Sequence, residues 1–106
     1  MDIWTSLGAF AFFESERLSF RPLIFLDRFD LHEIVSNPKN LQFFFPATQT
    51  QHETDCLLVH YFMKEPLGVW AIVDKELEKM IGVVRFEKID VQKRTAELGY
   101  FLNASY

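Results

Sequence analysis

The sequence predicts an α+β fold with the element order β-α-α-β-β-β, in which a mostly antiparallel sheet carries its helices on one face. Three observations lead to this prediction. An alternating apolar and polar segment comes first, two segments with helical periodicity follow, and three strand-like segments with short links come last. The length of 106 residues allows one domain at most, and a composition with 49% apolar and 25% charged residues is typical of globular proteins.

The first predicted strand follows an apolar N-terminal run. Residues 1–15 contain "IWTSLGAFAFF", which lacks a basic segment and is too short to span a bilayer, so we expect an arm that docks on the domain. In residues 17–23, Leu18 and Phe20 alternate with polar residues, as in a half-buried strand. Pro22 should confine this strand to a sheet edge or end its ladder of hydrogen bonds.

Two helices are expected next. The first covers about residues 27–36 and is stopped by the Asn-Pro pair that follows. The second covers about residues 50–64, because Thr50 and Glu53 fit a capping box in which each side chain accepts a hydrogen bond from the other's backbone N–H.

The buried face of the second helix is predicted from two i, i+4 pairs, Leu57 with Tyr61 and Leu58 with Phe62. Cys56 lies beside this face and is interpreted as a small core filler. A reactive thiol is the less favoured alternative, since no cationic neighbour is evident to activate it. As the single cysteine, it cannot form an intrachain disulfide, which favours a reducing, cytoplasmic location.

Three strands are predicted in the last third of the sequence, at residues 69–73, 81–89 and 95–102. The first is almost entirely apolar, as in a central strand, and the other two alternate. Charged links of a few residues, at 74–79 and 90–93, join them. We therefore expect an antiparallel meander.

The charge pattern bears on possible partners. The net charge is −4, from 11 basic and 15 acidic residues without long runs of one sign. Nucleic acids and anionic membranes both require a basic surface, so neither is expected as a partner. Three scattered histidines (His32, His52 and His60) and one cysteine are too few to predict a metal site.

Gly99 lies inside the last predicted strand. A glycine weakens a strand and commonly marks a bulge or a close approach of the backbone to a ligand. Alternatively, a large neighbouring side chain, such as Trp70 or Phe86, fills the space that the glycine leaves. The residues themselves do not decide between these interpretations.

Glu97 lies in the same strand and could act as a general base if its face of the sheet opens onto a cleft. The residues alone favour a different interpretation, a cross-strand ion pair with Arg85 or Lys88.

Between the helices, Phe43, Phe44 and Phe45 precede Pro46. Three consecutive aromatic side chains cannot all enter one core, so this loop either walls a substrate pocket or plugs the space under the sheet.

Four stretches together, in this order, resemble the GNAT superfamily of acetyl-CoA-dependent N-acetyltransferases, and in particular the subgroup that acetylates the N-termini of ribosomal proteins. "ESERLSFRPL" resembles the opening strand T-E-R-L-x-L-R-P, and "AELGYFLNASY" resembles the fourth-strand motif A-E-I-G-Y-x-L-x-P-x-Y. The other two are "IVSNPKNLQFFFP", which resembles the segment between the first two helices, and "GVWAIVDKELEKMIGVVRFEKID", which resembles the following hairpin.

The resemblance covers only the N-terminal half of that fold. It implies one partial domain over residues 1–106, with 1–15 as the arm and 16–106 as the first half of the fold. In the family, a glycine-rich loop holds the cofactor's pyrophosphate immediately after the position of Tyr106. We therefore expect the complete enzyme to transfer acetyl from acetyl-CoA to an amine, and this chain alone to bind acetyl-CoA weakly and to be inactive.

The resemblance also implies roles for residues in the site. The backbone of Tyr100, Phe101 and Leu102 would approach the thioester, and the aromatic loop at residues 43–45 would wall the acceptor pocket. Glu97 would be the candidate base or the contact for the acceptor ammonium. The acceptor could be a protein N-terminus or a small molecule.

A different class of function remains open. The chain could be a binding or assembly module without catalysis, in which the exposed edge of the fourth strand pairs with another chain. Under either hypothesis we expect a homo-oligomer, formed through that strand edge or through the N-terminal arm.

Overall fold

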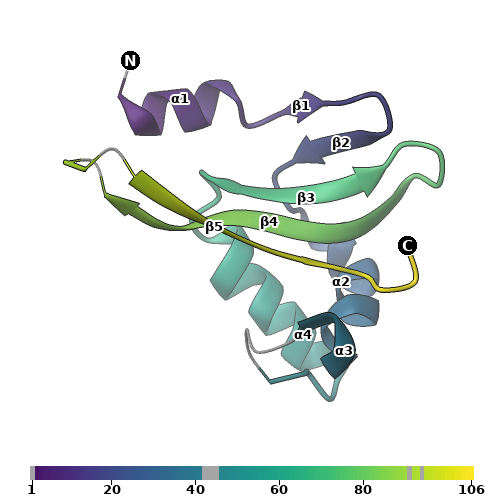
Figure 1. Cartoon of the computed structure of the whole chain (residues 1–106). Coiled ribbons are helices and arrows are strands. Elements are labelled where there is room, and N and C mark those ends of the chain that lie inside the picture. Colours follow the sequence, from purple (N-terminus) through teal and green to yellow (C-terminus); the bar gives the residue numbers. More distant parts are fainter. Residues whose placement is uncertain (1, 42–45, 91, 94) are drawn as a thin grey trace.

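The computed structural model describes residues 2–41, 46–90, 92–93 and 95–106 (Figure 1). Its elements, in chain order, are α1 (Ile3–Ala9), β1 (Phe13–Glu14), β2 (Leu18–Arg21), the 3₁₀ turn η1 (Phe25–Asp27), α2 (Arg28–Val35), α3 (Pro38–Leu41), α4 (Gln51–Leu57), the π-helical segment η2 (Leu58–Met63), β3 (Val69–Asp74), β4 (Lys79–Asp90) and β5 (Thr95–Leu102). Among the described residues, none of the helices is both long and apolar enough to cross a bilayer.

The strands form one antiparallel sheet with the order β1-β2-β3-β4-β5. The α+β class and the meander of the last three strands are confirmed. β1 is an additional strand contributed by the N-terminal arm, where Phe13 pairs with Phe20. Because β1 flanks β2, β2 is not an edge strand, and Pro22 acts only by ending its ladder after Arg21.

The helices α2, α3 and α4 cover one face of the sheet, as predicted (Figure 1). They share with it a core of Leu23, Leu31, Ile34, Val35, Leu41, Leu58, Phe62, Val69, Ala71, Met80, Val83 and Phe101. The arm packs against the opposite face: Trp70 alternates with the core residues of β3, and its indole Nε1 donates to the carbonyl oxygen of Phe10 at 3.1 Å.

A buried carboxylate organises the turn from β2 into α2. The side chain of Asp27 is only 5% exposed, and Arg21 donates to its two oxygens at 2.9 and 2.7 Å. The same carboxylate accepts the backbone N–H of Ile24 at 2.8 Å. A carboxylate taken from water is tolerated only with such partners, so this pair fixes where the first helical segment begins.

The second helix begins with the predicted cap, since Thr50 Oγ1 accepts the N–H of Glu53 at 3.1 Å. The reciprocal bond differs from the capping box: Glu53 accepts the N–H of Gln49, at 2.9 Å, and not that of Thr50. After Leu57 the helix widens into η2, where Lys64 donates to the carbonyl oxygen of Val59 five residues earlier.

The predicted buried face of this helix is only partly correct. Leu58 and Phe62 are fully buried, but Tyr61 is 45% exposed. The prediction for Cys56 is wrong, because its side chain is exposed. It lies two residues from the inward-facing Thr54 and Leu58, and a step of two residues in a helix points to the opposite side.

Candidate functional site

The β4–β5 pair contains a bulge that changes where one side chain points. Phe86 pairs with Leu98, and Lys88 pairs with Glu97, so Glu87 has no register partner on β5. An extra residue of this kind leaves the ladder locally and re-aims its side chain, and bulges are common beside active sites.

Glu87 occupies the space that Gly99 leaves open. A Cβ at position 99 would stand 2.6 Å from Oε1 and 2.8 Å from Cγ of Glu87. Of the two interpretations of this glycine, the structure supports the neighbouring side chain, although that neighbour is Glu87 and not Trp70 or Phe86. The bulge lies on β4, two residues beyond Arg85, which is the register partner of Gly99.

A small cavity of about 60 Å³, which we call the inner pocket, lies at this point. A cavity of this size has room for about two water molecules. Its wall combines aromatic residues of η2 with the middle of β4 and the second half of β5. It is lined by Tyr61, Phe62, Val83, Arg85, Glu87, Gly99, Tyr100 and Phe101.

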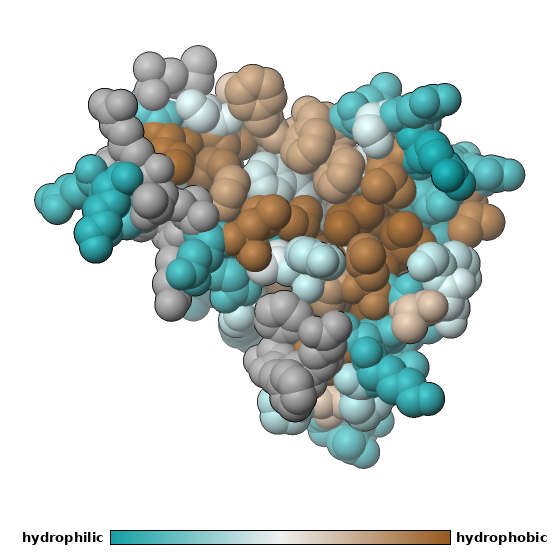
Figure 2. Space-filling model, in the orientation of Figure 1, coloured by the Kyte–Doolittle hydropathy of each residue, from teal (hydrophilic) through white to brown (hydrophobic). Residues whose placement is uncertain are grey.

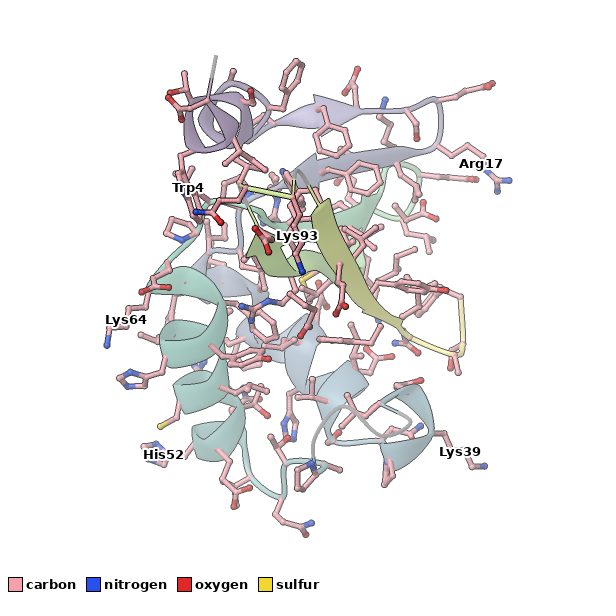
Figure 3. The ribbon with its side chains drawn as sticks, turned by 60° about the vertical axis from the view of Figure 1, so that its left-hand side comes forward. Trp4, Arg17, Lys39, His52, Lys64 and Lys93 are labelled. Atoms are coloured by element: carbon pink, nitrogen blue, oxygen red, sulfur yellow. The ribbon has the colours of Figure 1, made fainter. Side chains whose placement is uncertain are left out.

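A second cavity of about 570 Å³, which we call the outer groove, adjoins the inner pocket. It is lined by Trp4, Glu65, Pro66, Leu67, Val69, Arg85, Phe86 and Glu87. Arg85 and Glu87 line both cavities, so these two side chains form their common wall. In the view of Figure 3, Trp4 on α1 lies above the end of the second helix, from which Lys64 projects outward.

Arg85 is held by the helix and not by either glutamate of the groove. Its Nη1 donates to the carbonyl oxygen of Tyr61 at 3.3 Å, and its guanidinium lies 4.3 Å from the centre of the Tyr61 ring. Its Nε is buried and has no hydrogen-bond partner within the part of the chain that the structure describes. An unpaired buried donor is costly, so this atom favours a polar group or a water molecule in the inner pocket.

The predicted cofactor residues of β5 fall on both faces of the sheet. Phe101 is buried in the core and packs on Phe62, whereas Tyr100 and Leu102 are 58% and 42% exposed. Tyr100 and Phe101 both line the inner pocket. β5 is the last strand of the sheet, so one side of its backbone faces no further described strand. An edge of this kind can pair with an extended ligand or with another strand.

The remaining predicted site residues are Glu97, Phe43, Phe44 and Phe45. Glu97 is exposed and is not among the residues that line the two cavities. Phe43, Phe44 and Phe45 lie outside the described residues. The roles assigned to these four residues therefore remain predictions. Among the described residues, no group of three His, Cys, Asp or Glu side chains could hold a metal ion.

Sequence reasoning missed Glu87 as a site residue. The available signal was Gly99, because a glycine in a strand leaves space for a neighbour. Choosing that neighbour requires the register of β4 on β5, and the bulge that sets it has no sequence signature here.

Comparison with known proteins decides the family. The family model described as "Acetyltransferase (GNAT) domain" matches residues 17–106. The chain belongs to the GNAT acetyltransferase family. No curated protein matches it in sequence.

Solved GNAT structures share the fold at low sequence identity. An acetyltransferase (GNAT family) from Bacillus anthracis is 21% identical with a TM-score of 0.72, over 90% of this chain and 55% of that one. A GCN5-related N-acetyltransferase from Brucella melitensis is 20% identical with a TM-score of 0.69, over 89% and 45%. Ribosomal-protein-S5-alanine acetyltransferase from Vibrio fischeri is 21% identical with a TM-score of 0.59, over 90% and 57%. The chain thus spans about half the length of these GNAT proteins.

Proposed function

We propose that this chain contributes the acetyl-transfer site of an acetyl-CoA-dependent N-acetyltransferase, with the reaction at the inner pocket. The observation that carries the proposal is the position of this pocket. It lies against Gly99, Tyr100 and Phe101, within the strand whose backbone is implied to approach the thioester by the resemblance to the GNAT family. The family membership supplies the reaction class.

Residues of this chain would act at two points. Acetyl-CoA supplies an acetyl thioester, whose carbonyl carbon is the electrophile. Backbone N–H groups on the edge of β5 would hydrogen-bond the carbonyl oxygen, where negative charge develops during attack. As the C–N bond forms, the C–S bond would break and CoA would leave as its thiol with one proton of the nitrogen. The other proton, which the acceptor ammonium must lose before its nitrogen can attack, would go to Glu87. Glu97, on the same strand as Gly99, remains the second candidate for this proton.

The chain alone is expected to bind acetyl-CoA weakly. The cofactor's pyrophosphate needs a cradle of backbone N–H groups, as at the start of a helix. The resemblance places that cradle after the position of Tyr106, and the solved relatives are about twice as long as this chain. We therefore propose that binding and turnover belong to a longer polypeptide.

The second candidate is an assembly module without catalysis, and the exposed side chains of β5 favour it. Leu98, Tyr100 and Leu102 are 57%, 58% and 42% exposed. Figure 2 shows hydrophobic side chains gathered over the face of the molecule that β5 crosses in Figure 1. An edge strand with such side chains could pair with a second copy. The N-terminal arm is the other proposed route to a homo-oligomer.

Calorimetric titration with acetyl-CoA tests both candidates, using the 106-residue chain and the longest polypeptide that its reading frame encodes. Acetylation of an amine is followed by mass spectrometry, and the oligomeric state by sedimentation. We expect roughly micromolar binding and transfer from the longer polypeptide only. A longer polypeptide that neither binds acetyl-CoA nor transfers acetyl would contradict the enzymatic proposal. If no longer polypeptide is encoded and the chain self-associates without binding acetyl-CoA, the assembly module is supported.

A further inference from the structure

We propose that Asn40 is a positioning residue for β5, and that its hydrogen bond to the turn after β5 replaces the constraint of a turn proline. This inference rests on the proposed function, because it concerns the strand whose backbone would hydrogen-bond the thioester. Asn40 lies in α3 and is not among the residues that line the inner pocket or the outer groove. It would therefore act only through the position of β5.

The carboxyl end of β5 has β4 as its one neighbour among the described strands. There the N–H of Asn103 donates to the carbonyl oxygen of Ile81 at 2.7 Å. Alternate residues of an antiparallel ladder turn their backbone groups to the neighbouring strand, so those of Leu102 and Tyr100 face the open edge. Leu102 is bonded directly to Asn103, so the place of Asn103 sets the direction of the outermost N–H at this edge.

The chain turns immediately after β5. The N–H of Tyr106 donates to the carbonyl oxygen of Asn103 at 3.0 Å, which closes a β-turn with Ala104 in its second position. Proline is favoured at this position because its ring fixes φ, and the motif A-E-I-G-Y-x-L-x-P-x-Y has proline where this chain has alanine. Alanine keeps the N–H that proline lacks, and Ala104 donates it to Oδ1 of Asn40 at 2.7 Å. A contact from α3 thus constrains the turn from outside.

The side chains of Asn40 and Asn103 are both buried, at 7% and 4% exposure, and both are hydrogen-bonded. Nδ2 of Asn40 donates to the carbonyl oxygen of Ile34 on α2 at 3.0 Å. Nδ2 of Asn103 donates to Oε1 of Glu33, also on α2, at 3.2 Å. Buried amides left without partners are costly, so these directional contacts specify one position for the end of β5 beside α2 and α3 (Figure 1). Apolar contacts would hold the same segments together without that precision.

The test compares Asn40→Ala with Asn37→Ala in the longest polypeptide that the reading frame encodes, with 1,5-diaminopentane as the amine. Asn37 lies directly before α3, and its side chain accepts only the N–H of Lys39 among the contacts described. In Asn40→Ala we expect the dissociation constant and the KM of acetyl-CoA to rise about fivefold, as for one lost hydrogen bond, with an unchanged KM for the amine. Asn37→Ala should change none of these values. Addition of Ala104→Pro to Asn40→Ala should reverse most of the rise, because the proline ring constrains the turn.

Amide hydrogen exchange of the 106-residue chain, followed by NMR, gives a second readout that needs no acetyl-CoA. In Asn40→Ala the N–H of Asn103 should exchange about fivefold faster, because the end of β5 opens locally. The N–H of Lys75, which donates to the carbonyl oxygen of Arg17 at the far end of β2 and β3, should exchange at its original rate.

Four results would overturn the inference. They are an unchanged affinity for acetyl-CoA in Asn40→Ala, an equal rise in the KM of the amine, no recovery with Ala104→Pro, and equally faster exchange at Lys75, which would mean that Asn40 stabilises the whole fold. An unaltered longer polypeptide that binds no acetyl-CoA would contradict the proposed function. One that binds acetyl-CoA equally well with and without the Asn40 side chain would contradict only this inference.

Discussion

The carboxylate of Glu87 lies over Gly99, with Oε1 only 2.6 Å from the point where a Cβ at position 99 would stand. Two features produce this contact. The bulge in β4 takes Glu87 out of register, and the missing side chain on β5 leaves room for it. The result is an acidic group between a small pocket and a larger groove.

This contact predicts the effect of Gly99→Ala. Because Cγ of Glu87 would also be 2.8 Å from the new methyl group, the whole side chain must move and not only its tip. We expect a loss of about 1 kcal/mol in unfolding free energy, measured by urea denaturation. The loss should shrink when Glu87 is also changed to Ala, since the two positions are coupled. Equal losses in both backgrounds would mean that Glu87 does not occupy this space.

A second glycine predicts a larger effect. A Cβ at Gly82 would lie 2.6 Å from the carbonyl oxygen of Phe101 and 3.3 Å from Cα of Leu102, so the backbones of β4 and β5 would have to separate. Gly82→Ala should cost about 2–3 kcal/mol of unfolding free energy. Gly8→Ala is the control: it lies in α1 with nothing within 4 Å of the new methyl group, and should be neutral or stabilise by up to about 1 kcal/mol. Similar losses in both variants would contradict the packing of β4 on β5.

The buried carboxylate of Asp27 predicts a strong dependence on its partner. Asp27→Ala leaves the Arg21 guanidinium and the N–H of Ile24 without their acceptor. We expect a loss of about 2–4 kcal/mol, seen as a lower urea midpoint with an unchanged slope. Asp2→Ala, which removes an exposed cap from the short helix α1, should cost about 1 kcal/mol or less. A loss at Asp27 no larger than that at Asp2 would show that the pair does not fix the β2–α2 turn.

An ion pair between α2 and β4 predicts a pH effect on stability. The ammonium of Lys79, 2.7 Å away, lowers the pKa of Glu33, and a hydrogen bond from Asn103 lowers it further. A carboxyl whose pKa is lower in the folded state stabilises the protein above its unfolded pKa, and this contribution is lost as the pH falls through the folded pKa. Stability should therefore decrease between about pH 5 and pH 2, and less steeply in Lys79→Met. An unchanged slope in Lys79→Met would contradict this cause.

Much of the sheet could be predicted because its signals are local. The period of two in residues 95–102 and the short charged links identify the last three strands, and the bounds of β5 agree with the prediction. β1 was missed because a strand of two residues has no measurable period. The inward placement of Tyr61 failed because a π-helical segment changes the angle between successive side chains, which a 3.6-residue periodicity cannot anticipate.

The candidate site was less predictable for a physical reason. The inner pocket is lined by η2 and by the bulged pair of strands, and the outer groove is lined by α1 as well. The residues of the candidate site therefore meet only after three separate segments of the chain have packed together. Local patterns identified Gly99 and Glu97 on β5. The carboxylate at the inner pocket is that of Glu87 on β4, and its position there depends on how β4 pairs with β5. Family resemblance indicated the strand and not this side chain.

The measurement that tests the central claim most directly is the steady-state rate of CoA release by the longest polypeptide of this reading frame, with 1,5-diaminopentane as acceptor. Glu87→Gln is compared with Glu76→Gln, which removes an equal charge from the exposed β3–β4 turn. The account predicts that Glu87→Gln lowers kcat about 100-fold or more, as for loss of a proton acceptor, and that Glu76→Gln does not change it. An unchanged kcat in Glu87→Gln would contradict acetyl transfer assisted by this carboxylate at the inner pocket.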